Sequence, residues 1–435
     1  MRHLALACLV AVSLAACDRV PIDSGQSELV LASPDLSVVF LQPELSVRFE
    51  PTGPSGAVSL RIRNKDIDFD STAGAFVYVR TLVPGLNAFD YTITNSEGAV
   101  ARDTFYAVHL PLEPSALASP TDGVARAGAA VSALSGGRVL VSGGAGVSGS
   151  ALASASVQFE DGPFINTREI TLLRRRADHT ATAVADGSLL LGGASTATSE
   201  VSSELVREPE FVDAKGVARP VSVASDAFPE RSGHVAKAVV VGGETYVTLF
   251  GGVTPITGGL DASGTVDVYR VVPDGASVRL ERLTPAGGAG GFPTLSGAAL
   301  AETGPTSAVV TGLAADGGLT LALEWRSAPS GALPFSIDVA ETGALRTPRA
   351  DAAVLDLGNG LTLVTGGRDA NGFTLGTFEV YAPAARRAFR FPPEIALAVP
   401  RSGHVATIFG GNRIVVSGGR PSSGGPVVAR EAFTF

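Results

Sequence analysis

Five arginines recur at equivalent positions in the chain, each followed at a regular distance by a pair of glycines. The distance runs from 16 residues, between Arg176 and Gly192, to 20 residues, between Arg231 and Gly251. A guanidinium group stays charged, and its planar fork of donors suits carboxylate and phosphate oxygens. The set could line an anion-binding face or could hold neighbouring parts of the fold together, and the sequence leaves both open. The five are Arg126, Arg176, Arg231, Arg349 and Arg401.

Three of the five histidines stand three residues after one of these arginines, at His179, His234 and His404. Neutral imidazole is a common metal ligand. Equivalent positions in successive repeats lie on different structural units and do not converge on one ion. We therefore predict that these imidazoles hydrogen-bond to loop backbone and do not form a metal site.

Three alternating aspartates, Asp66, Asp68 and Asp70, raise the question of calcium. An EF-hand loop would need glycine where Ser71 stands and glutamate where Val77 stands. We therefore predict no metal and no cofactor. The chain also lacks a phosphate-binding loop and a Gly-x-Ser-x-Gly nucleophile motif, so no catalytic residue is assigned.

Thiol chemistry is confined to the start of the chain. A basic residue, a short apolar run and two small residues predict a signal peptide over 1–16. The stretch Leu14-Ala15-Ala16-Cys17 resembles the lipobox of bacterial lipoproteins. This resemblance implies cleavage before Cys17, acylation of its thiol, and a lipid anchor in the inner or outer membrane of a bacterial cell envelope. Since Cys8 leaves with the signal, the mature chain keeps no thiol for a disulfide.

The elements that carry these residues follow from the composition. The chain has 435 residues, of which 45% are hydrophobic and 17% charged, with 52 glycines and 27 prolines. This length exceeds what one hydrophobic core usually supports, and much glycine and proline with little charge favours short strands joined by tight turns. We expect an all-β protein of two domains. The net charge of −9 disfavours nucleic acid as a partner.

The first domain is expected over residues 27–111, where apolar and polar side chains alternate, as at 58–63. A period of two is typical of strands that bury one face. The segment 82–98 resembles the late strands of bacterial immunoglobulin-like domains, which implies a small β-sandwich. Residues 17–26 are expected to form a lipidated tether, and the prolines of 112–121 indicate a linker.

The second domain is expected over residues 122–435, where the arginines mark an internal repeat. Five intervals of about 55 residues separate Arg126 from Arg401. The motif Arg401-Ser402-Gly403-His404, with its glycine pair, resembles the kelch repeat, which implies a β-propeller of four-stranded blades. A degenerate copy, with Leu295 at the arginine position, brings the expected number of blades to six.

The last repeat ends at Phe435, before a fourth strand can form. An open sheet edge would expose unpaired amides. We therefore predict that a segment within 103–120 crosses over and pairs with the strand at 429–433.

The loops that leave the second strand of each repeat vary in length, while the strands repeat. Variable loops on a rigid scaffold commonly carry binding residues. We expect a monomeric binding scaffold that recognises an envelope protein or a glycan through these loops, with catalysis as the less favoured role. The alternative is a hydrolase or isomerase acting on sugars, for which kelch-type propellers offer precedents. The loops are 145–153, 194–203, 253–265, 368–376 and 420–428.

Overall fold

The computed structural model is all-β in the parts of the chain that it describes. Those parts contain strands, turns and a single 3-10 helix, η2 (Pro383–Ala385). The predicted signal peptide over 1–16 and the predicted lipidation site Cys17 lie outside them. The described residues are 19–21, 28–33, 35–52, 59–95, 98, 100–117, 124–161, 164–195, 205–224, 228–256, 259–284, 291–328 and 333–435.

The chain divides into two units, Met1–His109 and Leu110–Phe435. The first unit contains two sheets that share one core. Alternate residues of one strand, Phe89, Tyr91 and Ile93, are buried in it, as the period of two predicts. One sheet has the order β1 (Arg19–Pro21), β2 (Glu28–Ser33), β3 (Glu44–Thr52), β7 (Ala75–Thr81), β6 (Phe69–Asp70), and the other β5 (Lys65–Ile67), β4 (Ser59–Ile62), β8 (Gly85–Thr94), β9 (Val100–His109).

One part of the predicted tether belongs to this unit. Arg19 pairs with Val30 and Pro21 with Glu28, so β1 extends the first sheet. Within the segment 17–26 expected as a lipidated tether, these three positions are held by backbone pairing with β2. The aspartates at 66, 68 and 70 are exposed, and Asp70 accepts backbone N–H groups of its own turn.

The second unit contains six sheets of four or five strands in its described part, together with a hairpin of β22 (Val253–Ile256) and β23 (Gly259–Ala262). We number the sheets I to VI. Sheet I contains β11 (Ala127–Leu134), β12 (Arg138–Ala145), β13 (Leu152–Asp161) and β14 (Phe164–Arg176); sheet II β15 (Thr180–Val184), β16 (Gly187–Leu191), β17 (Glu210–Asp213) and β18 (Ala218–Pro220); sheet III β20 (Val235–Val241), β21 (Glu244–Phe250), β24 (Val266–Asp274), β25 (Ser277–Arg282) and β19 (Ser222–Ala224).

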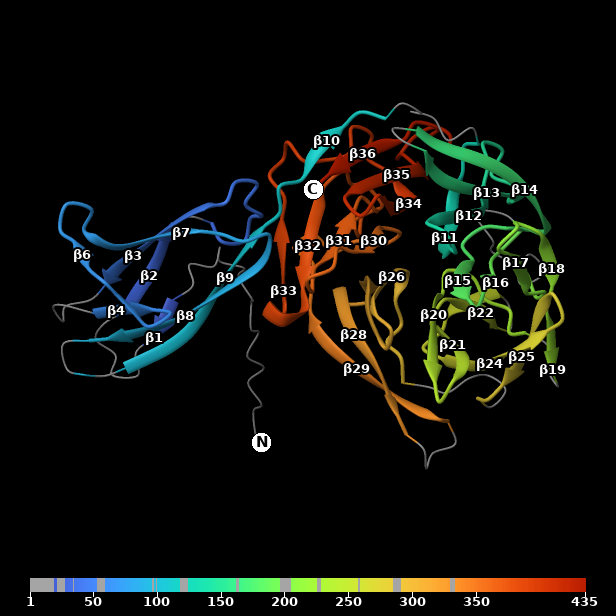
Figure 1. The fold of residues 1–435 in the computed structure, drawn as a ribbon, viewed down its shortest axis with the longest axis horizontal. Coiled ribbons are helices and arrows are strands. Elements are labelled where there is room, and N and C mark those ends of the chain that lie inside the picture. The colour runs from blue at the N-terminus through green and yellow to red at the C-terminus, as the bar shows by residue number, and fades with distance from the viewer. Residues whose placement is uncertain are drawn as a thin grey trace, which may run out of the picture. The chain divides into compact units, whose positions relative to one another are not determined.

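The remaining three sheets repeat this plan, and Figure 1 shows the first strands of all six around a common centre. Sheet IV contains β26 (Ser296–Gly304), β27 (Ser307–Ala314), β28 (Gly317–Ser327) and β29 (Phe335–Gly343); sheet V β30 (Ala353–Asp356), β31 (Thr362–Thr365), β32 (Phe378–Ala382) and β33 (Arg387–Arg390); sheet VI β34 (Ser402–Phe409), β35 (Arg413–Arg420), β36 (Glu431–Thr434) and β10 (Glu113–Ser115).

Neighbouring sheets bury their faces against each other. Leu140 and Val157 of sheet I share an apolar cluster with Leu190 and Val212 of sheet II. Further clusters join sheets II and III, III and IV, and VI and I. Since each sheet is covered on both sides, its strands are rich in Val, Leu and Ala and do not alternate strictly with polar residues.

Sheet VI is completed by a strand from the start of the second unit. Glu113 of β10 pairs with Thr434 of β36, and Ser115 pairs with Ala432. The pairing strand lies within the 103–120 range expected for it. It covers the edge of β36, whose amides would otherwise lack partners.

The glycine pairs lie where one sheet meets the next. Gly143 and Gly418 have φ angles of 58° and 69°, and a Cβ at either position would overlap a backbone carbonyl, that of Arg176 and of Arg126 respectively. The N–H of Gly419 donates to the carbonyl of Arg126 at 2.8 Å. Glycine is therefore required here both for its left-handed backbone and for the close approach of a neighbouring chain segment.

Candidate functional site

The five repeated arginines lie inside the fold. Each residue is 1% exposed or less. The guanidinium donates to the carbonyl of the first glycine in its own repeat, at 2.9 Å from Arg349 to Gly366 and 3.2 Å from Arg231 to Gly251. Groups so deeply buried do not reach a ligand, so their assignment to a ligand face is corrected and the structural role stands. The correction applies to Arg126, Arg176, Arg231, Arg349 and Arg401.

In four repeats the arginine also binds a carboxylate on the third strand of the sheet. Arg349 Nη2 lies 2.5 Å from Glu379, whose oxygens also accept the backbone N–H groups of Arg346 at 2.7 Å and Thr347 at 2.9 Å. Burial lowers the pKa of the Arg349 guanidinium, and Glu379 opposes that shift. Glu379 thus binds both Arg349 and the segment just before it to the third strand of the sheet. The other pairs are Arg176–Glu210, Arg231–Asp267 and Arg401–Glu431.

The repeated histidines join one sheet to the next. Nε2 of His179 lies 2.8 Å from the Ser142 hydroxyl, and Nε2 of His404 lies 2.9 Å from the Thr365 hydroxyl, each on the preceding sheet. Burial and the neighbouring arginines lower the pKa of His404 to about 3 and the pKa of His179 well below 6.5. These imidazoles are neutral structural groups, and their hydroxyl partners were not foreseen.

Six residues at the start of the inner strands form a ring that we call the rim. All have φ between 52° and 66°. The N–H of Asp178 donates to the Gly128 carbonyl at 2.8 Å, and the N–H of Gly403 donates to the Asp351 carbonyl at 2.8 Å. Backbone hydrogen bonds of this kind fix successive sheets at one end. The rim is Gly128, Asp178, Gly233, Gly297, Asp351 and Gly403.

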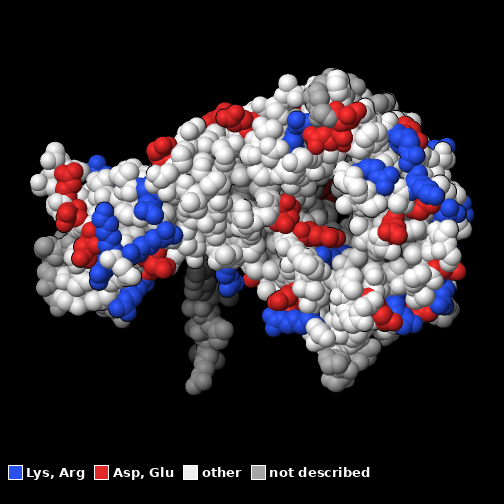
Figure 2. Space-filling model, in the orientation of Figure 1, with Lys and Arg blue, Asp and Glu red and all other residues white. Residues whose placement is uncertain are grey.

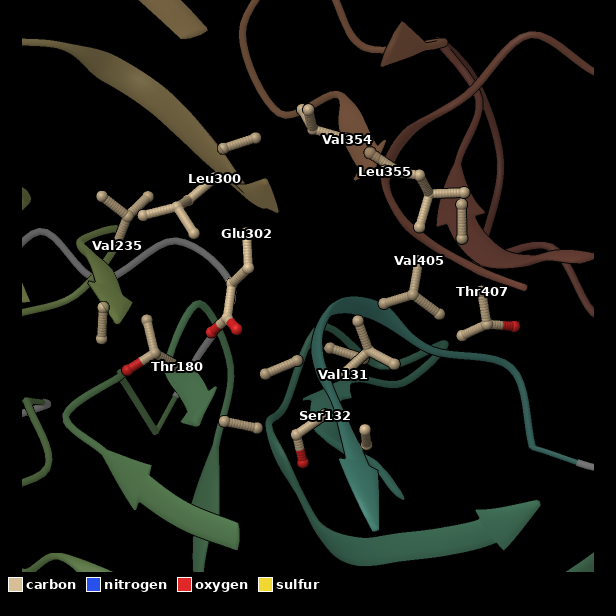
Figure 3. A pocket seen from close by; sticks show the side chains of 18 of the residues that line it. Val131, Ser132, Thr180, Val235, Leu300, Glu302, Val354, Leu355, Val405 and Thr407 are labelled. Carbon is tan, nitrogen blue, oxygen red and sulfur yellow. The ribbon is translucent and has the colours of Figure 1, made fainter. Parts of the chain in front are cut away.

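A cavity of about 470 Å³ begins next to the rim, lined by residues of all six inner strands. Figure 2 shows a hollow in this unit with acidic side chains beside it, and Figure 3 shows the wall. Alanine and valine make up much of the lining. The carboxylate of Glu302, 54% exposed, points into the space and lies 3.5 Å from Nζ of the buried Lys237.

Four charged side chains gather at the rim end of the cavity, and we call them the mouth cluster. Asp178 keeps contact with solvent, yet desolvation by the surrounding protein and the charge of Asp351 raise its pKa to about 7. Arg368 and Arg420 act in the opposite direction on that pKa. Arg368 forms an ion pair with Asp351 at 2.5 Å. The cluster therefore holds one paired and one unpaired carboxyl beside two cations.

The loops that follow the second strands of sheets V and VI lie at this end of the cavity. Ser402 pairs with Arg420 in the ladder of sheet VI, so the end of β35 and the start of β34 lie together. Thr374 of sheet V hydrogen-bonds Ser422 of sheet VI at 2.8 Å, which ties two loops to each other. Phe373 stands on the first of these loops and is 66% exposed. We call the rim, the mouth cluster and these loops the mouth.

The mouth cluster was not assigned from the sequence, although the repeat contains a signal. Asp178 and Asp351 occupy the position that glycine fills in the other four copies. Arg368 and Arg420 directly follow a glycine pair, where other copies have Ala or Val. These four residues stand at positions where two copies differ from all the others, and that difference is the signal in the sequence.

Small antiparallel sheets that each contribute a first strand to one central cavity fit a β-propeller. Among solved structures, the chain is similar to one titled "Structure of YjhT", with a TM-score of 0.51 and 14% identity, covering 74% of this chain and 97% of that chain. This likeness shows the fold alone. No family model matches the chain, and no curated protein matches it significantly.

Over the ranges that the structure describes, no group of three or more His, Cys, Asp or Glu side chains is placed to hold a metal ion. No helix in the described part of the chain has the length and apolar character needed to cross a membrane.

Proposed function

We propose that this chain is an exported bacterial lipoprotein in which an immunoglobulin-like domain carries a six-bladed kelch-like propeller that binds a glycan or a protein at its mouth. The anchor would be the acylated thiol of Cys17, in the inner or outer membrane. The proposal includes no cofactor and a monomeric chain.

One observation carries the binding role. The mouth cluster places charged side chains that lack full pairing above a cavity of about 470 Å³, on a backbone ring that the fold holds rigidly. Sites that bind small molecules are typically concave spaces of this size with a few polar groups at fixed positions. All five repeated arginines bind carbonyl oxygens inside the fold, so the charged groups that can contact a ligand are those of the mouth cluster.

A soluble form that begins at residue 18 tests this role against a glycan array and envelope extracts. In a mouth variant, residues 369–373 and 421–426 become Gly-Ser turns of equal length. A matched control replaces 358–360, the turn at the opposite end of sheet V, by Gly-Ser-Gly. We expect capture by the parent and the control and loss of capture by the mouth variant. Equal capture by all three forms would place the binding surface elsewhere.

The second candidate is a hydrolase or isomerase acting on sugars. The pKa of Asp178, about 7, beside the charge of Asp351 favours it, because acid–base catalysis uses a proton donor that titrates near neutral pH. Incubation of each captured glycan with the protein, followed by NMR, separates the two roles. A product formed by the parent and lost in Asp178→Asn supports the enzyme; an unchanged glycan supports the binder.

A further inference from the structure

Arg420 forms no ion pair and no side-chain hydrogen bond with the described residues, although its charge acts on Asp178. It ends β35 at the mouth and is partly buried, and its Nε is shielded from solvent. Within the described residues this Nε has no hydrogen-bond acceptor, and the guanidinium is in no ion pair. Nε is also unpaired in several other arginines, Arg176 and Arg231 among them, but their Nη atoms bind carbonyl and carboxylate oxygens, whereas Arg420 has no such contact in the described part of the chain. A shielded donor left unpaired is costly in a folded protein, so its place at a mouth points to an acceptor that arrives from outside.

Asp178 is the second group at the mouth without a side-chain partner in the described structure. Its carboxyl occupies the space above Gly128, where a Cβ would overlap Oδ1. A carboxyl that holds its proton near neutral pH can donate to a hydroxyl and repels an anion less than a carboxylate does. Arg368 and Asp351 lie beside it, and their opposite charges neutralise each other in an ion pair.

The remaining surroundings suit one small ring. Glu302, the charged group inside the cavity, is five residues along β26 from Gly297 of the rim, or about 16 Å. A ligand held at the rim would therefore not meet that carboxylate. The exposed ring of Phe373 stands on the adjoining loop and offers an apolar face of the kind on which sugar rings pack.

We propose that the mouth binds a sugar ring that carries one anionic group, with the anion on Arg420 and a ring hydroxyl on Asp178. This proposal rests on the glycan branch of the proposed function and deepens it. The guanidinium fork prefers a planar or tetrahedral oxyanion to a neutral hydroxyl, and Asp178 then selects a ligand that has hydroxyls beside its charge. The same chemistry would accept a carboxylate or a sulfate.

The test uses the full mature chain and four methyl glycosides of one ring: galactose, galacturonic acid, galactose 6-sulfate and 6-deoxygalactose. Titration calorimetry at neutral pH gives each Kd. We expect at least a tenfold lower Kd for one or both anionic rings than for galactose, and the two anionic rings identify the anion. We expect Arg420→Gln to remove that preference while galactose binding persists.

Two further variants complete the design. Asp178→Gly, which removes the carboxyl at a position where four copies have glycine, should weaken neutral and anionic rings alike by about tenfold. Arg326→Gln, on an exposed arginine of sheet IV, is the matched control and should change nothing. Circular dichroism melts confirm that each variant is folded.

The outcomes separate the two levels of the proposal. Equal Kd values for galactose and the anionic rings, or a preference that survives Arg420→Gln, would overturn the anionic ligand and leave glycan binding in place. No binding of any ring, combined with loop-dependent capture of a protein, would overturn the glycan branch as well.

Discussion

Replacing Glu379 by leucine tests whether the arginine–carboxylate pairs hold the repeat together. The carboxylate is 1% exposed and accepts three donors: Arg349 and the N–H groups of Arg346 and Thr347. After Glu379→Leu, Arg349 keeps its charge and retains only uncharged acceptors, among them the Gly366 carbonyl at 2.9 Å and the Thr377 hydroxyl at 3.3 Å. A buried charge that has lost its counter-ion is strongly destabilising.

Sheet IV shows how the chain does without such a pair. Leu295 stands at the arginine position, and Leu321 pairs with Val310 as Glu379 pairs with Val364. Both leucines are buried in one apolar cluster. Pro293 stands where Thr347 stands in sheet V, so one of the two backbone donors is absent there. The degenerate copy has therefore replaced the ion pair and its backbone donor together.

The magnitudes follow from these contacts. Glu379→Leu should cost about 3–5 kcal/mol in the free energy of unfolding, because the Arg349 charge is left alone. Adding Arg349→Leu removes the stranded charge and should restore at least about 2 kcal/mol, within the range of coupling energies for residues in contact. The double variant stays below the parent, since the part-buried N–H groups of Arg346 and Thr347 lose their carboxylate acceptor.

Trp325 supplies the assay. It is the single tryptophan of the chain, it is 3% exposed, and it lies in sheet IV, so its fluorescence reports unfolding of the second unit. Urea titrations of the parent, both single variants and the double variant give a complete cycle. If Glu379→Leu costs less than about 1 kcal/mol, or the two single costs simply add, the pair does not stabilise the repeat as argued.

Three further outcomes are expected. Burial lowers the pKa of His179, His234 and His404, to about 3 for His404, so protonation of these imidazoles in acid favours the unfolded chain. For His404 the stabilisation of the fold is complete above about pH 6.5 and falls by about 1.4 kcal/mol per pH unit towards pH 3. The substitution His404→Gln should therefore reduce the change of the urea midpoint with pH. Asp178 has the opposite effect, since its raised pKa stabilises the fold below about pH 4 and this stabilisation is lost as the pH rises through 7. Both the parent and His404→Gln contain Asp178, so their difference at each pH isolates the histidine. Gly143→Ala places a Cβ against a backbone carbonyl at positive φ and should lower the free energy of unfolding by at least about 2 kcal/mol in the same urea titration. A loss below about 0.5 kcal/mol would show that the contact between the two sheets adjusts to the added Cβ. Cys17→Ser should abolish labelling by radioactive palmitate in a bacterial host and release the protein from the membrane fraction, whereas unchanged labelling would refute the lipid anchor.

The repeat made much of the second unit predictable. The short apolar runs at 405–409 and 413–417, each bounded by glycine, are typical of strands, and they lie in β34 and β35. The covered edge of β36 could be expected because an unpaired edge at the end of a chain is unstable. The arrangement of the sheets around a centre is what the kelch resemblance implies, since repetition alone would also fit an open solenoid.

The role of the arginines could not be decided from the sequence, and the reason is physical. A buried ion pair and an anion site use the same side chains, and the difference lies in whether a carboxylate on another strand reaches the guanidinium. Glu379 lies thirty residues from Arg349 in the chain, and the sheet brings them together. The mouth cluster was missed because its four residues come from three sheets, and each is an exception to the repeat.

The two rim aspartates separate the candidate site from the scaffold. Asp178 and Asp351 hold φ angles of 52° and 53°, a conformation that costs a non-glycine residue about 1 kcal/mol or more and costs glycine little. Glycine fills the same position in four copies, so the fold does not need a carboxyl there. Local strain that the fold does not require is typical of functional sites. We therefore expect Asp178→Gly to raise the free energy of unfolding, measured through Trp325 fluorescence at neutral pH, while it weakens binding of the galactosides by about tenfold. A glycine variant that is less stable than the parent would mean that the Asp178 carboxyl stabilises the fold, and the strain at this residue would no longer support a binding site at the mouth.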